Sequence, residues 1–364
     1  MRSLYLAGLV TLALRITTIA APADRLILIT LDGVRCQEIF QGMDRAVWQA
    51  QNEGKDIAET ELYTKFWADT PEDRRRKLLP FFWDVLLRDH GAIVGNRFAG
   101  NPMKLTNRHQ FSYPGYSEIL TGVARDLEIK SNDKIQNPHP TVLEFFREQL
   151  HLPVPQVAAF ACWEVMDWIV ESRKGTITSN AGFEAYASDD PFVQLLSRQR
   201  FETPTPWNSV RHDSYTFRFA LAHLKTHQPR VLYLSLGETD DWSHDKRYDR
   251  VLEALHRDDA YFRELWEWLQ AQEDYRDRTA IFIGTDHGRG DDPLNWTQHN
   301  DKLEGAGYVW FAAAGAGITA RGELKPVEPV KQNQIAATLA RALGLDYGAH
   351  QPAAGKPIEE FFRR

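Results

Sequence analysis

Six short runs of apolar residues recur along the chain and lack the strict alternation of apolar and polar positions that marks a half-exposed strand. They span 25–31, 92–94, 157–162, 231–236, 279–284 and 308–313. Strands of a parallel sheet have this pattern, because helices cover both faces and leave the strand no polar side. The runs therefore predict six buried strands.

Helical patterns lie between these runs, over 69–88, 246–272 and 333–343. In 246–272 the apolar residues recur every three or four positions and form one stripe along a helix. In 69–88, Pro71 followed by two acidic residues is typical of a first helical turn. Strands that alternate with helices predict an α/β fold with a doubly wound, mostly parallel central sheet and helices on both faces.

Two stretches of the chain, near 43–90 and 175–208, are polar, charged and rich in turn residues. They lack the long apolar runs of the predicted strands, so we expect helical and loop insertions there rather than parts of the sheet. We expect 24–364 to form a single domain around the sheet.

The N-terminus has the pattern of an export signal. Arg2 precedes a mostly apolar run, which Arg15 interrupts and which ends in small residues such as Ala20 and Ala21. This predicts a signal peptide over 1–23 and a secreted or periplasmic protein; the alternative is a short N-terminal extension of a cytosolic protein. No other stretch reaches the ~18 uninterrupted apolar residues of a membrane span, so none is expected after signal removal.

The composition narrows the class of protein. Of the 364 residues, 43% are hydrophobic and 26% charged, which is typical of a globular chain and excludes disordered, collagen-like and coiled-coil proteins. The net charge of −7 provides no basic excess for a nucleic-acid-binding surface. Cys36 and Cys162 form no CxxC pair, which argues against a thiolate metal or redox site and leaves a single disulfide open.

Residues that carry chemistry follow three of the predicted strands. In open α/β sheets, ligands bind beyond the carboxyl ends of the strands. The acidic and histidine residues at these places are Asp32, Asp240, His244, Asp286, His287 and His299. Carboxylates and imidazoles together suit Zn²⁺ or Mn²⁺. Each residue alone is also typical of a turn or a helix cap, but their shared position predicts that the set converges on a metal site.

A candidate nucleophile lies in the segment Phe111-Ser-Tyr-Pro-Gly-Tyr-Ser-Glu-Ile-Leu-Thr-Gly122. Ser112 precedes Pro114, which fits a first helical turn, so its hydroxyl is expected near a helix N-terminus, where an anion such as phosphate is favoured. Beside a divalent cation, a serine hydroxyl is a competent nucleophile without a histidine base. Ser112 could also be the N-cap of a helix over 114–120, and the two roles are compatible.

Taken together and in order, these motifs resemble the alkaline phosphatase superfamily. The resemblance rests on Asp32-Gly33, the segment from Ser112 to Gly122, Glu238-Thr-Asp240 with His244, Asp286-His287-Gly288, and His299. It points to the type I phosphodiesterase/nucleotide pyrophosphatase branch or the sulfatase-like branch, and it spans roughly Leu26 to Glu360. It implies an alkaline phosphatase-like catalytic domain and a phosphoric ester hydrolase.

Carried over by position, the resemblance implies a site for two divalent metal ions, with Zn²⁺ expected first and Mn²⁺ as the alternative. One ion is implied at Asp240, His244 and His299. The other is implied at Asp32, Asp286 and His287, with Ser112 bridging to it as the nucleophile. Ser112 would attack the phosphorus of a small-molecule phosphate ester, and water would then hydrolyse the covalent phosphoserine.

The chain also departs from these relatives. Tyr116 stands where sulfatases have an arginine, which disfavours a formylglycine sulfatase. Gly115 stands where phosphodiesterases often have an asparagine that binds a phosphate oxygen, so Asn107, Lys104 or a backbone N–H is expected to make that contact. Arg289 either binds phosphate or forms an ion pair within its loop. A sulfate or phosphonate ester hydrolase, a phosphotransferase and a non-catalytic metal- or phosphate-binding relative stay as alternatives.

Overall fold

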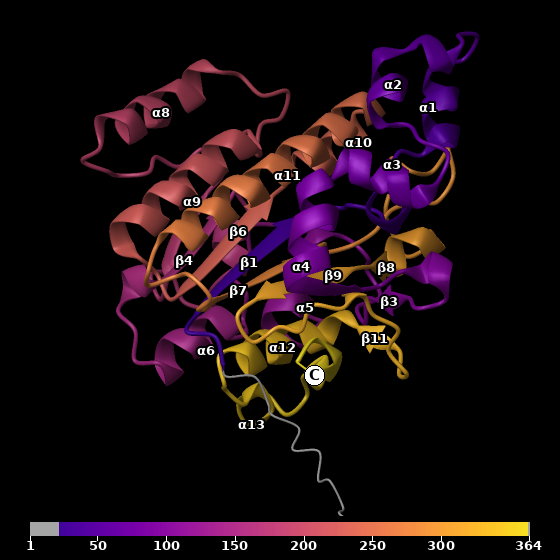
Figure 1. Ribbon diagram of the computed structural model, residues 1–364. Coiled ribbons are helices and arrows are strands. Elements are labelled where there is room, and N and C mark those ends of the chain that lie inside the picture. The colour runs from indigo at the N-terminus through magenta and orange to yellow at the C-terminus, as the bar shows by residue number, and fades with distance from the viewer. Residues whose placement is uncertain (1–21, 363–364) are drawn as a thin grey trace, which may run out of the picture.

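An eight-stranded sheet runs through the centre of the molecule, and helices pack on both of its faces (Figure 1). The computed structural model describes residues 22–362. The strand order is β10-β2-β9-β7-β1-β6-β4-β5, and a second, three-stranded sheet has the order β11-β3-β8. The strands are β1 (Arg25–Leu31), β2 (Gly91–Val94), β3 (Met103–Lys104), β4 (Val157–Ala161), β5 (Thr178–Ala181), β6 (Val231–Leu236), β7 (Thr279–Gly284), β8 (Tyr308–Val309), β9 (Phe311–Gly315), β10 (Gly322–Glu323) and β11 (Val330–Lys331).

The central sheet is mostly parallel, as the apolar runs predict. β1 pairs in parallel with β6 on one side and with β7 on the other, and β4 and β5 continue in the same direction. Among the eight strands described, β9 is the exception, because it pairs antiparallel with both β7 and β2. The α/β fold class with a mostly parallel central sheet is confirmed.

The helices form one layer on each face of this sheet. α9 and α11 lie over one face, and α5, α6 and α12 lie over the other (Figure 1). The α-helices are α1 (Arg45–Gln51), α2 (Glu61–Phe66), α3 (Pro71–Leu78), α4 (Arg88–His90), α5 (Ser112–Thr121), α6 (Val142–Gln149), α7 (Met166–Ile169), α8 (Pro191–Glu202), α9 (Asp213–His227), α10 (Glu238–His244), α11 (Tyr248–Ala271), α12 (Ile335–Ala342) and α13 (Tyr347–His350). Shorter 3₁₀ or π-helical turns are η1 (Gln37–Gln41), η2 (Ile57–Glu59), η3 (Phe82–Leu87), η4 (Arg97–Ala99), η5 (Val154–Gln156), η6 (Glu304–Gly307), η7 (Gln332–Gln334) and η8 (Glu359–Phe361).

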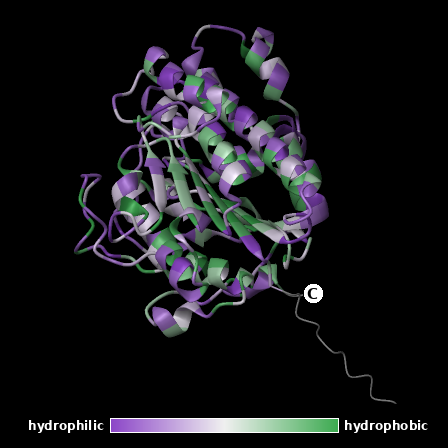
Figure 2. Cartoon of the chain, turned by 90° about the vertical axis from the view of Figure 1, so that its left-hand side faces the viewer, coloured by the Kyte–Doolittle hydropathy of each residue, from purple (hydrophilic) through white to green (hydrophobic). Residues whose placement is uncertain are grey.

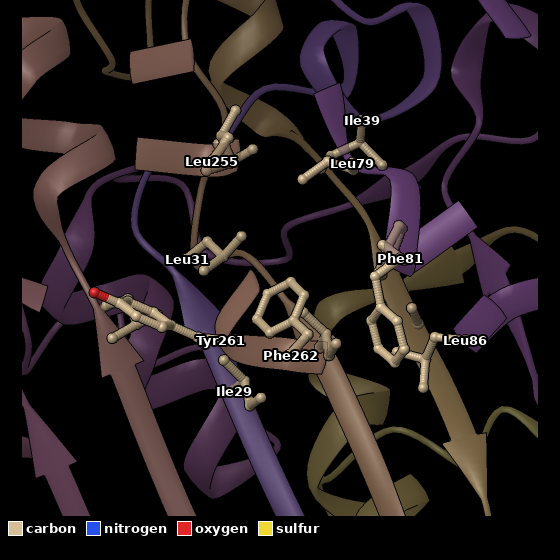
Figure 3. Close-up of a cluster of buried hydrophobic side chains, with 14 of the residues drawn as sticks. Ile29, Leu31, Ile39, Leu79, Phe81, Leu86, Leu255, Tyr261 and Phe262 are labelled. Carbon is tan, nitrogen blue, oxygen red and sulfur yellow. The ribbon is translucent and has the colours of Figure 1, made fainter. Parts of the chain in front are cut away.

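The two faces of the sheet bury separate hydrophobic clusters, because successive side chains of a strand point in opposite directions. In β1, Ile29 and Leu31 belong to the cluster beneath α9 and α11, whereas Leu28 belongs to the cluster against α5 and α12. Figure 3 shows Phe262 of α11 in the first cluster, close to Ile29 and Leu31. The strands are the most consistently apolar part of the fold (Figure 2). Since burying one such side chain contributes about 1.5–3 kcal/mol, both helical layers are held firmly to the central strands.

The predicted strand at 308–313 is divided in the structure. Residues 308–309 form β8 in the small sheet, Trp310 breaks the run, and β9 continues in the central sheet. The indole of Trp310 is buried and donates a hydrogen bond to the carbonyl of Val34 at 3.1 Å, which fixes the break. An apolar run does not encode strand direction, so the antiparallel orientation of β9 was not predicted.

The stretch 175–208 was expected to stay outside the sheet, but it contributes the edge strand β5. Its sequence is Thr-Ser-Asn-Ala, and its first two residues are only partly buried. An edge strand can lack an apolar run, because helices cover its faces less completely than those of a central strand. The stretch 43–90 contributes α1 to α4 and no strand to either sheet.

The predicted helix at 69–88 is interrupted. The hydroxyl of Thr70 accepts a hydrogen bond from the backbone N–H of Asp73 at 3.2 Å, and α3 runs from there to Leu78. Leu79 then leaves the helical region with φ −129° and ψ 66°, because it precedes Pro80. The π-helical turn η3 follows and joins α4. The two other predicted helices are present as α11 and α12.

Most of the predicted signal peptide over 1–23 lies outside the described residues, so it stays a prediction. Among residues 22–362, no helix combines the length and the apolar character that a membrane crossing requires. Cys36 and Cys162 are both buried and both free, so no disulfide links them.

Candidate functional site

Three neighbouring strands bring the candidate ligands together. Asp32 directly follows β1, which ends at Leu31. β6 leads into α10, which carries Asp240 and His244, and Asp286 and His287 follow shortly after β7. β1 lies between β6 and β7 in the sheet, so their carboxyl ends meet at one edge. His299 reaches the same place from the loop after β7, where its ring stacks on that of His287 with 4.0 Å between centroids. All six candidate ligands predicted from the sequence therefore converge.

Asp32, Asp286 and His287 form the more deeply buried group. Oδ1 of Asp32 and Oδ2 of Asp286 each lie 3.4 Å from Nε2 of His287. Neither oxygen has a hydrogen-bond donor, although both are buried. The other oxygen of each carboxylate is held: Tyr116 donates to Asp32 Oδ2 at 2.9 Å, and the Gly33 N–H donates to Asp286 Oδ1 at 3.0 Å.

Asp240, His244 and His299 form a second, more open group. Nε2 of His244 lies 3.2 Å from Asp240 Oδ2 and 3.0 Å from Nε2 of His299. Nε2 of His299 lies 3.7 Å from Asp240 Oδ1. His287 Nε2 is 3.9 Å from the same Asp240 oxygen, so this histidine stands between the two groups. The His244 side chain is 39% exposed and faces the entrance of the site.

Backbone carbonyls set the orientation of His287 and His299. Nδ1 of His287 donates to the carbonyl of Gly288 at 2.9 Å, and Nδ1 of His299 donates to the carbonyl of Gln110 at 3.3 Å. A carbonyl only accepts, so each Nδ1 carries a proton and each Nε2 is directed at the carboxylates. Metal-binding histidines are commonly held by a hydrogen bond of this kind from the other ring nitrogen.

Ser112 is the first residue of α5 and is 5% exposed. Its Oγ lies 3.3 Å from Nε2 of His287, so the candidate nucleophile adjoins the buried group. Phe111, not Ser112, is the N-cap of α5, so the interpretation of Ser112 as a helix cap is wrong. The side chain of Asn132 takes part of that role by accepting the N–H of Tyr113 at 2.9 Å. The hydroxyl of Ser112 is therefore not needed to cap the helix.

Close packing holds α5 against the loop after β7. Gly115 has no room for a side chain, because a Cβ there would lie 2.5 Å from the carbonyl oxygen of Asp286. The buried amide of Gln332 donates to the carbonyls of both Gly115 and Asp286, at 2.9 and 3.0 Å. These contacts fix Ser112 relative to the loop after β7.

The electrostatics of the buried group favour an added positive charge. Burial raises the pKa of the Asp32 carboxyl, and the charge of Asp240 raises it further. Burial also raises the pKa of Asp286 well above its usual range, with Asp32 adding to the effect. Burial opposes the charged form of His287, but Asp286 and Asp32 outweigh it and raise the His287 pKa to about 9. Buried carboxylates at this distance require compensation, which protons or cations supply.

The residues present fit metal ions on this evidence. Two buried carboxylate oxygens accept no hydrogen bond, and the histidine rings are held through Nδ1, which leaves Nε2 as the ligand atom. Carboxylate oxygens and imidazole nitrogens together form a ligand set suited to Zn²⁺ or Mn²⁺. The ligand atoms of Asp32, Asp286 and His287 lie within 4.8 Å of one another, and so do those of Asp240, His287 and His299. His244 adjoins the second set through its contacts with Asp240 and His299.

Two of the weaker candidates have structural partners. Arg289 is 1% exposed, and its guanidinium contacts Asp240 Oδ1 and donates to the carbonyl of Thr297 at 2.7 Å. Burial opposes ionisation of Asp240, but Arg289 holds its pKa well below the usual range. Arg289 is therefore engaged in an ion pair with Asp240 and is not free to bind a phosphate group. The amide of Asn107 donates to Glu118 at 2.8 Å and is likewise engaged.

A cleft of about 210 Å³ opens onto both groups. Asp32, Ser112, Asp240, His244 and His299 line its floor together with residues that were not predicted as part of the site. These additional residues are Asn132, Trp163, Ser209, Val210, Gly237 and Asp241. They come from loops whose place follows from the tertiary fold, and no local motif marks them.

No protein-family model and no curated protein matches the chain. Among solved structures, the alkaline phosphatase PafA matches with a TM-score of 0.60 at 11% identity, over 94% of this chain and 100% of that one. A 2-O GAG sulfatase matches with a TM-score of 0.53 at 13% identity, over 94% and 74%.

The lipoteichoic acid synthase LtaP from Listeria monocytogenes matches with a TM-score of 0.54 at 11% identity, over 91% of this chain and 74% of that one. These proteins differ in the reactions that their names describe, and they share a fold with this chain across nearly its whole length. Fold likeness at such low identity carries no assignment of activity. The chain has the fold of the alkaline phosphatase superfamily.

Proposed function

We propose that the chain is a metal-dependent hydrolase of phosphate esters that acts through a covalent phosphoserine at Ser112. One observation carries this proposal. The Ser112 hydroxyl and two carboxylate oxygens without donors, one each from Asp32 and Asp286, all lie 3.3–3.4 Å from Nε2 of His287. A cleft opens onto this group from solvent, so a small ester can reach the hydroxyl.

Two sets of side chains would hold the cations, with Zn²⁺ expected first and Mn²⁺ as the alternative. One set is Asp240, His244 and His299, and the other is Asp32, Asp286 and His287. When bound, two divalent cations would stabilise negative charge on the attacking and leaving oxygens of an in-line displacement.

The residues of the chain position the reaction. Oγ of Ser112 would form a bond to phosphorus as the bond to the leaving oxygen breaks, and water would later hydrolyse the phosphoserine. The N-terminus of α5, where Ser112 sits, favours the negative charge of the phosphoryl group. Burial of the site beneath the cleft keeps this charge away from bulk solvent, where such interactions are weaker.

Substitution of Ser112 tests the proposal. In Ser112→Ala we expect the hydrolysis of an aryl phosphate ester to fall by roughly 10³-fold or more, with metal content unchanged, because the variant loses the attacking oxygen and keeps every other ligand. Ser117→Ala is the matched control, since Ser117 is a buried serine on the same helix whose hydroxyl has no hydrogen-bond partner. Full activity in the Ser112 variant would remove this residue from the mechanism.

The same assay distinguishes the alternative activities. Wild-type protein is given an aryl phosphate monoester, an aryl phosphate diester and an aryl sulfate, each with and without a chelator. We expect a chelator-sensitive reaction with a phosphate ester. Turnover of the sulfate alone would instead assign a sulfate ester hydrolase, and metal binding with no turnover of any ester would assign a non-catalytic relative.

A further inference from the structure

A buried tyrosine hydroxyl contacts one of the candidate metal ligands. Tyr116 lies on α5, is 1% exposed, and donates a hydrogen bond to Oδ2 of Asp32 at 2.9 Å. The hydroxyl of Ser235, from β6, donates in turn to the hydroxyl of Tyr116 at 3.3 Å. Because Ser235 occupies an acceptor position of the phenol, the single proton of Tyr116 is directed at Asp32.

This contact determines which oxygen of Asp32 is left for a cation. With Oδ2 engaged by Tyr116, Oδ1 is the oxygen without a donor, and it faces Nε2 of His287 at 3.4 Å. Asp286 is arranged in the same way, except that a backbone N–H, that of Gly33, engages its Oδ1 and leaves Oδ2 free. One carboxylate is therefore oriented by the main chain and the other by a single side chain.

We propose that Tyr116 is a positioning residue, which directs Oδ1 of Asp32 toward the cation held with Asp286 and His287. This inference deepens the proposed function and rests on it. Without the phenol hydroxyl, the Asp32 carboxylate would lose the hydrogen bond that fixes its rotation, and a ligand whose orientation is not fixed binds its metal more weakly. The role is one of orientation, since Tyr116 itself is directed at the carboxylate rather than at the substrate cleft.

Tyr233 provides a matched control. It is fully buried on β6, and its hydroxyl bonds to Oγ1 of Thr30 at 3.0 Å instead of to a candidate ligand. Tyr116→Phe and Tyr233→Phe therefore each remove one buried phenol hydroxyl. The hydroxyl of Tyr233 also adjoins Ser235, but only Tyr116→Phe removes a direct hydrogen bond to a candidate metal ligand.

The experiment measures Zn²⁺ binding by competition with a chromogenic chelator. We expect wild-type protein to bind two ions per chain and Tyr116→Phe to bind one of them about 10–100-fold more weakly. Tyr233→Phe should lose no more affinity than Ser235→Ala, because it disturbs Ser235 and leaves the bond from Tyr116 to Asp32 in place. Ser235→Ala should weaken the same site by a smaller factor, because it perturbs Tyr116 without removing its bond to Asp32. Thermal midpoints of the metal-free variants report any general loss of packing, which should be similar for the two tyrosine variants.

The outcomes separate this inference from the proposed function. If wild-type protein binds two ions and Tyr116→Phe binds both with unchanged affinity, the positioning role is overturned and the proposed function stands. An equal loss of affinity in Tyr233→Phe would also overturn it, since the effect would then come from packing. If wild-type protein binds no Zn²⁺ or Mn²⁺, the proposed function fails together with the inference.

Discussion

At the scale of single residues, three histidines of this protein show how the hydrogen-bond partners of a ring determine its role. His287 and His299 each donate Nδ1–H to a carbonyl and direct Nε2 at carboxylates. His223 instead donates Nε2–H to the carbonyl of Pro155 at 2.9 Å and accepts the hydroxyl proton of Tyr186 at Nδ1. Both ring nitrogens of His223 have hydrogen-bond partners, and no acidic side chain lies beside the ring. These surroundings favour the neutral form of His223.

This environment predicts a loss of stability in acid. Burial lowers the pKa of His223 from 6.5 to about 4, so between these values the unfolded chain binds a proton that the folded chain does not. The free energy of unfolding should therefore fall as pH drops through this window, by a total on the order of 3 kcal/mol from this residue. Urea denaturation of wild type and His223→Gln across pH 4–7 measures the contribution as the difference between the two curves.

His151→Gln serves as the control, because it makes the same change of side chain at an exposed position. If the curves of wild type and His223→Gln keep a constant separation over the whole range, His223 does not titrate as its surroundings indicate.

The sequence predicts which residues come together at the candidate site, but not the side chains that hold them in place. Asp32, Asp240 and Asp286 stand directly after or close behind apolar runs, and the geometry of a parallel sheet brings such positions together. The bonds from Tyr116 to Asp32 and from Arg289 to Asp240 join residues far apart in sequence. Their existence depends on how α5 and the loop after β7 pack, which no local pattern encodes.

At the scale of elements, the position of a strand in the sheet decides whether its bounds can be predicted from the sequence. β1, β6 and β7 have the bounds that their apolar runs predict, because all three lie inside the sheet and are buried on both faces. β5 was missed because an edge strand can be polar, and the predicted helix at 69–88 was too long because Pro80 ends α3. Strand direction and the division at Trp310 follow from tertiary packing.

The packing of α5 makes a prediction about this element as a whole. In Gly115→Ala, the new Cβ would meet the carbonyl oxygen of Asp286 at 2.5 Å, so α5 must shift away from the loop after β7. We expect a loss of about 1–3 kcal/mol in the free energy of unfolding and weaker metal binding, because Ser112 and the Asp286 loop move apart. Chemical denaturation and Zn²⁺ titration measure the two effects.

Gly348→Ala is the control for this substitution, since a Cβ at Gly348 in α13 would meet only a side-chain oxygen of Asp346 at 3.3 Å. A Gly115→Ala variant as stable as wild type, with normal metal binding, would show that the helix and the loop are not held as closely as described.

At the scale of the whole molecule, the buried acidic centre predicts that metal binding stabilises the fold. Asp32, Asp286 and His287 are buried, and repulsion between the carboxylates opposes folding unless positive charge is present. A cation that binds only the folded chain stabilises it by about 2.7 kcal/mol per site at a concentration 100-fold above its Kd. We therefore expect Zn²⁺ to raise the thermal midpoint and a chelator to lower it.

Asp286→Asn provides the comparison for this effect. It removes one charged ligand of the buried group, so the Zn²⁺-dependent rise in the midpoint should shrink, while the metal-free protein should be less affected because the same repulsion is relieved. Identical midpoints of wild-type protein with Zn²⁺ and with chelator would contradict a metal site in this fold.

The place of β1 in the sheet has a consequence for how the protein is made. β1 is the earliest strand of the described chain, yet it is inserted between β6 and β7, which follow it by about two hundred residues or more. During translation, β1 therefore has neither of its partners until most of the chain has left the ribosome. We therefore expect the acidic centre to assemble only when synthesis is nearly complete, and any cation to bind after that point.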